Sequence, residues 1–125
     1  MELKAIHAHS QPWLDGMTRG ELRLLRCATC GHAQSLAPLA CAVCHGRDLQ
    51  WTDSLGRGTV RAASVVHRAP SDAYRPLVPY TLAMVQLDEG PRVMAHLAPG
   101  LPLGARVRAT FFEHDGRTLV RFISD

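Results

Sequence analysis

The chain after residue 58 is built from short runs in which apolar side chains alternate or concentrate as they do in β-strands. In residues 105–112, Val107, Ala109 and Phe111 alternate with polar side chains, and Val120 and Phe122 flank Arg121 further on. Successive side chains of a strand point to opposite faces, so this period of two predicts one buried and one solvated face. The strands predicted in this way cover residues 59–67, 80–87, 92–97, 105–112 and 118–123.

Segments rich in Gly and Pro separate these runs and predict chain reversals at residues 88–91, 101–104 and 114–116. Glycine supports tight hairpins because it tolerates the positive φ that such turns require. Five short strands in about 70 residues, with no helical stretch long enough for a crossover, predict a five-stranded antiparallel barrel of the OB-fold type. We therefore expect a mostly β protein.

The first 21 residues differ from the rest of the chain. Residues 1–9 are predicted to be a loose lead-in to a short helix that Ser10 caps, that has Pro12 in its first turn and that ends before Gly20. Two interpretations of its apolar stripe stay open, because such a stripe can pack on its own chain or anchor a partner protein. The stripe consists of Trp13, Leu14 and Met17.

Composition narrows the class of protein. Apolar residues make up 46% and charged residues 20% of the chain, and no apolar run approaches the ~20 residues of a membrane helix. The first residues lack the pattern of a secretory signal, so we expect a cytoplasmic protein with no membrane partner. The net charge of +3 comes with thirteen scattered arginines, which suit phosphate or carboxylate ligands as well as a nucleic acid.

Two Cys-x-x-Cys motifs, at residues 27–30 and 41–44, predict a metal site. Two residues between thiolates let both sulfurs reach one ion about 2.3 Å away, and two such knuckles complete a tetrahedron. Gly31 and Gly46 follow the knuckles, where we expect the chain to turn sharply. Disulfides and a rubredoxin-like iron site are the alternatives, and structural zinc is the interpretation we favour. The predicted ligands are Cys27, Cys30, Cys41 and Cys44.

The same motifs argue against catalysis by this chain. A site closed by four thiolates leaves no open position for substrate, and no further cysteine remains as a nucleophile. His32 and His45 adjoin the knuckles, where exposed surface residues are the ordinary interpretation and metal ligation the alternative. Asp88 and Glu89 form the only adjacent carboxylate pair and fall in a predicted turn, so no catalytic residue is predicted.

The long connection over residues 68–79 is the candidate ligand-binding segment. Loops of this length in a small barrel often carry function, although this one could equally cover an open barrel end. Its cations suit phosphate and its tyrosine suits a stacked base. The candidate residues are His67, Arg68, Tyr74 and Arg75. We expect three parts along the chain: a lead-in and helix over 1–21, a zinc ribbon over 22–54 and an OB-fold domain over 55–125.

Taken in order, the motifs resemble those of one family across residues 10–123. These motifs are a Trp-containing helix, Gly20-Glu21-Leu22-Arg23-Leu24, both Cys-x-x-Cys pairs, Trp51, Gly56-Arg57-Gly58-Thr59-Val60, Val65-Val66-His67-Arg68, Pro79-Tyr80, Val85-Gln86-Leu87-Asp88-Glu89-Gly90-Pro91 and Leu103-Gly104-Ala105-Arg106-Val107. The set is similar to the acyl-CoA-associated proteins that combine a rubredoxin-like zinc ribbon with an OB-fold. The resemblance implies a non-catalytic partner of thiolase-type enzymes, or of related acyl-CoA enzymes of lipid metabolism, that assists acyl-CoA binding or transfer.

Two other functions stay in view. A single-stranded nucleic-acid module also combines zinc ribbons, OB-folds and basic grooves with stacking aromatics. The predicted strands argue against it, because Phe111 and Phe122 belong to their inward pattern and only Tyr80 and Phe112 remain for stacking. A free-standing acyl-CoA enzyme is disfavoured because no nucleophile and base converge.

Overall fold

The fold is described from a computed structural model of the 125-residue chain, which describes residues 3–34 and 40–125, with side chains from residue 11 onward. Two compact units make it up: Met1–Leu55 with Glu89–Pro91, and Gly56–Asp88 with Arg92–Asp125. Residues 1–2 of the predicted lead-in and 35–39 of the predicted ribbon lie outside the described residues. Among those described, no helix has both the length and the apolar character needed to cross a bilayer.

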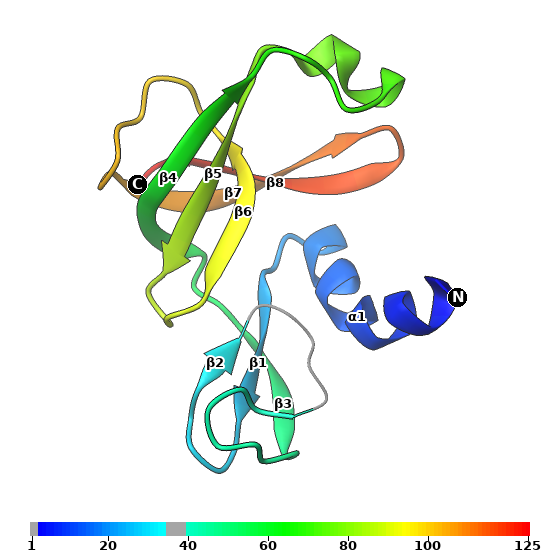
Figure 1. Cartoon of the computed structure of the whole chain (residues 1–125), viewed down its shortest axis with the longest axis vertical. Coiled ribbons are helices and arrows are strands. Elements are labelled where there is room, and N and C mark those ends of the chain that lie inside the picture. The colour runs from blue at the N-terminus through cyan, green and yellow to red at the C-terminus, as the bar shows by residue number, and fades with distance from the viewer. Residues whose placement is uncertain (1–2, 35–39) are drawn as a thin grey trace. The chain divides into compact units, whose positions relative to one another are not determined.

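The first unit begins with helix α1 (Leu3–Thr18; Figure 1). Residues 3–9 of the predicted lead-in are therefore helical, the predicted helix start near Ser10 was wrong, and Pro12 lies inside the helix. Leu3, Lys4 and Ala5 are strong helix formers, and Pro12 removes one backbone hydrogen bond without ending the helix.

Helix α1 ends in a Schellman motif. Gly20 has φ 79°, the N–H of Glu21 donates to the carbonyl of Gly16 at 2.8 Å, and the N–H of Gly20 donates to that of Met17 at 3.0 Å. The helix packs close to the strand that follows it. A Cβ added at Gly16 would come within 2.6 Å of the Arg23 side chain. A glycine is thus needed where α1 approaches that strand.

The helix buries only part of its predicted apolar stripe. Met17 is 8% exposed, Trp13 is half-buried and Leu14 is 43% exposed. The burial of Met17 fits the interpretation in which the stripe packs on its own chain. Leu14 and part of Trp13 remain accessible.

The rest of the first unit is a three-stranded antiparallel sheet in the order β2-β1-β3. Its strands are β1 (Arg23–Cys27), β2 (Ala33–Gln34) and β3 (Leu49–Asp53). The central strand carries the core of the unit, since Leu24, Leu25 and Cys27 are at most 4% exposed. A core of this size is small for a unit that folds by itself, which fits the prediction that folding of the ribbon depends on a bound metal.

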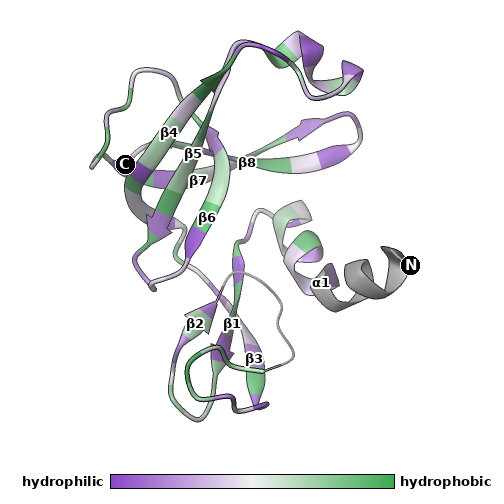
Figure 2. Ribbon diagram, viewed as in Figure 1, coloured by the Kyte–Doolittle hydropathy of each residue, from purple (hydrophilic) through white to green (hydrophobic). Residues whose placement is uncertain are grey.

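The second unit is a closed barrel in the order β4-β5-β6-β8-β7. The five predicted strands are confirmed, and hydrophobic residues run along β4 to β6 while the β5–β6 turn is hydrophilic (Figure 2). The strands are β4 (Arg57–Val66), β5 (Tyr80–Leu87), β6 (Arg92–Leu97), β7 (Arg106–His114) and β8 (Arg117–Ser124).

One pairing in the barrel differs from the expected antiparallel arrangement. Strands β6 and β8 run parallel, with His96 opposite Arg121 and Leu97 opposite Phe122, while the other pairs are antiparallel. The reason is one of parity. Directions cannot alternate all the way around a closed ring with an odd number of strands, so five strands require one parallel pair.

The barrel core follows the predicted alternation where the strands are paired on both sides. Val107 and Phe122 are fully buried and Val120 is 7% exposed. Phe111 was expected to face inward but is only partly buried, because β7 pairs with β4 over residues 106–108 and beyond that with β8 alone.

Two connections shape the barrel. The β7–β8 hairpin turns through Asp115 and Gly116, with φ of 51° and 74°, as expected for a two-residue turn of type I′. The connection from β4 to β5 contains a 3₁₀ helix, η1 (Asp72–Leu77), which extends beyond the ends of both strands (Figure 1). Only a loop was expected there.

Candidate metal centre and barrel surface

The two cysteine motifs fold into knuckles with the same hydrogen bonds. In each, the N–H of the first Cys donates to the carbonyl five residues on: Cys27 to His32 at 2.9 Å, and Cys41 to Gly46 at 2.8 Å. The carbonyl of that Cys accepts from the N–H four residues on, at 2.8 Å for Gly31 and 2.9 Å for His45. The knuckles thus present their thiols in equivalent ways.

The four sulfurs fit a tetrahedral ion. All four lie within 4.8 Å of one another, with Cys27 Sγ 3.5 Å from Cys44 Sγ and Cys30 Sγ 3.6 Å from Cys41 Sγ. Sulfurs bound about 2.3 Å from a central zinc would be about 3.8 Å apart. The S–S separations are far beyond the ~2.05 Å of a disulfide, so the disulfide alternative fails. The cysteines are positioned to bind a metal ion.

The charge balance of the cluster also calls for a cation. The N–H of Cys30 lowers the pKa of Cys27 to about 6, and the N–H of Cys44 lowers that of Cys41. At Cys44 the N–H of Gly46 lowers the pKa, but the thiols of Cys27 and Cys30 outweigh it and raise the pKa to about 12. Four thiolates this close cannot all be charged without a cation among them.

The two glycines after the knuckles have different roles, and only that of Gly31 was expected. Gly31 has φ 81°, but in the second knuckle the positive φ of 62° belongs to His45 rather than to Gly46. Gly46 is needed for space, because a Cβ there would lie 3.2 Å from Cys44 Sγ and 3.7 Å from Cys27 Sγ. His32 and His45 are exposed.

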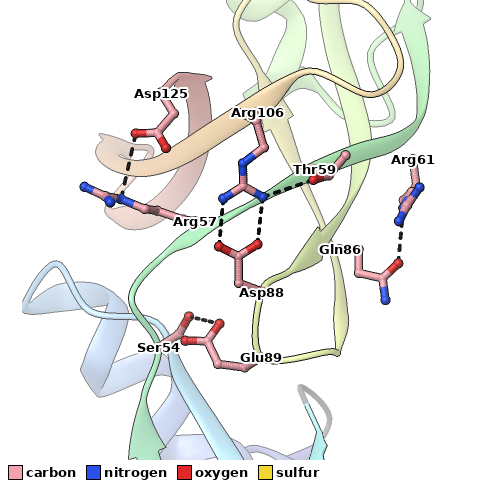
Figure 3. Close-up of polar contacts among 9 residues, drawn as sticks. All are labelled: Ser54, Arg57, Thr59, Arg61, Gln86, Asp88, Glu89, Arg106 and Asp125. Carbon is pink, nitrogen blue, oxygen red and sulfur yellow. Dashed lines mark hydrogen bonds and ion pairs between the residues drawn. The ribbon is translucent and has the colours of Figure 1, made fainter.

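The carboxylate pair in the β5–β6 turn is engaged in structural contacts (Figure 3). Asp88 accepts two hydrogen bonds of 2.7 Å from the Arg106 guanidinium, which lowers the pKa of Asp88 below its ordinary value. Glu89 accepts hydrogen bonds from Ser54 Oγ at 3.0 Å and from the N–H of Leu55 at 2.8 Å. Both side chains are therefore engaged in contacts that stabilise the fold.

The four predicted loop residues do not form one site. His67 and Arg68 are exposed, and Arg75 pairs with Asp72 at 3.1 Å on the surface of η1. Tyr74 is half-buried, with its ring 5.6 Å from that of His114 and 6.4 Å from that of Tyr80. Only Tyr74 joins the larger cluster on the barrel.

That cluster includes His96 and Arg121, which sequence reasoning missed, beside Tyr80 and Phe112. The ring of His96 lies 5.0 Å from Tyr80 and 5.3 Å, edge-on, from Phe112, and the Arg121 guanidinium carbon lies 4.4 Å from the Phe112 centroid. Tyr80, His96 and Arg121 also line one cavity of about 410 Å³. Its residues come from η1, from β5, β6 and β8, and from the connections beside them, so no local pattern marks it. A histidine within the otherwise apolar end of β6 was the available signal.

The fold and the cysteine site together define a zinc-ribbon protein with an OB-fold barrel. Residues 15–50 match the family model of the ChsH2 rubredoxin-like zinc ribbon domain, and residues 51–112 match that of the ChsH2 C-terminal OB-fold domain. The chain belongs to this ChsH2-type family, and the expected resemblance is confirmed.

Individual relatives support the assignment to this family. A DUF35 domain-containing scaffold protein of Methanocaldococcus jannaschii is 30% identical over 70% of this chain and 64% of its own length. A probable enoyl-CoA hydratase alpha subunit of Thermomonospora curvata is 29% identical over 74% of this chain and 28% of its own length. This chain thus spans less than two thirds of the length of these curated relatives.

A solved structure matches nearly the whole chain. The protein described as Ltp2-ChsH2(DUF35) aldolase superposes with a TM-score of 0.80 and 28% identity, over 92% of this chain and 93% of that chain. Both units of the fold therefore have counterparts in one solved chain.

Proposed function

We propose that this chain is a non-catalytic accessory subunit of an acyl-CoA enzyme and assists the binding or transfer of the acyl-CoA. The observation that carries the proposal is the match along nearly the full length to a chain of the Ltp2-ChsH2(DUF35) aldolase. Relatives described as scaffold proteins and as a hydratase alpha subunit support the same role. A thiolase-type enzyme is the partner we infer, with a related acyl-CoA hydratase as the nearest alternative.

The arrangement of the cysteines supports an accessory role. All four are gathered in one cluster, so the chain keeps no separate thiol for the nucleophilic step of thiolase chemistry. Zinc bound there would hold the ribbon and supply no chemistry, because four thiolates close its coordination sphere. A cytoplasmic location fits this site, since thiols stay reduced there.

The accessible part of α1 is the surface we propose for docking on the enzyme. Leu14 is 43% exposed beside the half-buried Trp13, and an aromatic residue next to an exposed aliphatic one is a common anchor of interfaces. For acyl-CoA we propose contacts from His67, Arg68 and Tyr74. Arg75 would have to leave Asp72 to join them.

Co-expression with a thiolase-type enzyme, or with an acyl-CoA hydratase, from the same organism tests the docking. We expect the two proteins to co-purify and the enzyme's kcat/KM for acyl-CoA to fall when this chain is left out. Leu14→Asp should weaken the complex, whereas Val43→Asp, at a 61%-exposed apolar position in a knuckle, should not. Separate elution of the two proteins at micromolar concentrations, with turnover unchanged, would refute the proposal. Salt-dependent binding of oligonucleotides, with no binding to the enzyme, would favour the nucleic-acid function.

A further inference from the structure

His96 is buried at a position where β6 should expose its side chain. Along this strand Ala95 is buried and Met94 is 70% exposed, so the period of two places residue 96 on the outward side. Yet His96 is only 9% exposed, because the rings of Tyr80 and Phe112 cover it. An imidazole covered in this way on the outside of a barrel indicates a built site rather than ordinary surface.

Arg121 brings a fixed positive charge to the same place. It lies opposite His96 in the parallel pair of β6 and β8, and its guanidinium stacks on the Phe112 ring. In the part of the chain that the structure describes, no carboxylate lies within 4.0 Å of this guanidinium. A guanidinium held on a ring needs little further ordering to bind an anion, and its planar fork suits a phosphate or a carboxylate.

These groups line a cavity of about 410 Å³, within the range of small-molecule sites. The lining residues with polar side chains are Tyr80, Thr81, His96 and Arg121. Burial, and then the charges of Arg121 and His114, lower the pKa of His96, so its ring is neutral at pH 7 and leaves Arg121 as the cation. The apolar wall consists of Leu77, Pro79, Leu97, Pro99 and Ile123.

The unit that carries the cavity is also the basic part of the protein. The barrel unit holds nine arginines and five acidic residues, a net charge of +4, whereas the other unit has five basic and six acidic residues. Three of the five acidic residues of the barrel are already paired with arginines: Asp72, Asp88 and Asp125. The field around the cavity therefore favours anions.

We propose that this cavity, here called the Arg121 cleft, binds an organic anion. Its phosphate or carboxylate group pairs with the Arg121 guanidinium, and its body packs on the Tyr80 ring and the aliphatic wall. The proposal rests on the acyl-CoA part of the proposed function only for the choice of probes. It adds an anion site on β8 to the contacts proposed above for His67, Arg68 and Tyr74.

Calorimetric titration of the full chain without any partner tests this site. The probes are coenzyme A, pantetheine, which has the same thiol arm without phosphate, and octanoate, which joins a carboxylate to an apolar chain. Arg121→Gln should weaken binding about tenfold or more, as loss of a charge-assisted hydrogen bond implies. Arg117→Gln, at the other end of β8, removes the same charge and should change affinity less than about twofold. Arg121→Lys keeps the charge but not the fork, and should fall between the two.

Each outcome of the titration decides a separate point. Binding of coenzyme A without binding of pantetheine identifies a phosphate as the anion, and binding of octanoate identifies a carboxylate. Three results would overturn the proposal. They are equal effects of Arg121→Gln and Arg117→Gln, equal binding of pantetheine and coenzyme A with no binding of octanoate, and no binding of any probe at millimolar concentration. Circular dichroism shows whether each variant is folded, and if Arg121→Gln is not, the comparison rests on Arg121→Lys. Because no enzyme is present, failure here is distinct from failure of the docking experiment.

Discussion

A methyl group added at Gly58 should destabilise the barrel strongly. Gly58 lies in β4 opposite Leu87, and an ideal Cβ there would lie 2.4 Å from the Gln86 carbonyl oxygen and 2.9 Å from Val85 Cγ1. The first contact is with the backbone of β5, so it can be relieved only by moving the paired strands apart. Overpacking usually costs about 1–3 kcal/mol, and a backbone clash belongs at the upper end of that range.

Thermal unfolding of Gly58→Ala, followed by circular dichroism, measures this effect. For a unit of about 70 residues, each kcal/mol shifts Tm by roughly 4–8 °C, so a fall of about 12–24 °C is expected. Gly100→Ala is the matched control. Gly100 has φ 84°, but nothing lies within 4 Å of the added Cβ, so only backbone strain of about 1–2 kcal/mol is incurred. A fall for Gly58→Ala no larger than that of the control would refute the reasoning that close approach of β4 and β5 requires a glycine.

Three further predictions concern the metal site, an ion pair and the helix. Cys44→Ser should abolish stoichiometric metal binding and unfold the ribbon, whereas Val43→Ser should leave both intact. Metal analysis and circular dichroism measure the two effects. A Cys44→Ser variant that keeps its metal would exclude Cys44 as a ligand. Asp88→Asn should lower Tm at neutral pH, because Arg106 lowers the pKa of Asp88. The difference in Tm from wild type should be fully present above pH 3.8 and shrink as the pH falls below it. A difference that does not change with pH would contradict the ion pair. Met17→Ala should cost about 2–3 kcal/mol in urea unfolding, and an unchanged midpoint would show that α1 is not packed on its unit.

The sequence was sufficient wherever a local pattern determines structure. The alternation around Val107 and Phe122 located strands, and Gly116 marked a turn whose φ of 74° needs that residue. The spacing of the cysteines predicted a cluster that the sulfurs form, because a knuckle is a local structure. Helix propensity competes with proline, however, and the start of α1 was misplaced for that reason.

The remaining features depend on contacts between residues distant in the sequence. The parallel pairing of β6 with β8 follows from closing five strands, which no single strand reveals. The Arg121 cleft draws its residues from η1, β5, β6 and β8, so Arg121 looked like an ordinary outward residue of an alternating strand. The positive φ of His45 was assigned to Gly46 because glycine is the usual residue in that conformation.

The pairing of β6 with β8 also sets an order of events during synthesis. Every strand of the ribbon is complete once Asp53 has been made, so its cysteines can capture an ion while the ribosome is still adding the barrel. The barrel has no such early stage. Strand β8 lies between β6 and β7, so the ring stays open until residues 117–124 emerge. The nascent chain therefore exposes the free edge of β6 to the cell until synthesis reaches β8, and within the barrel that edge is the place where chaperones or premature pairing would act first.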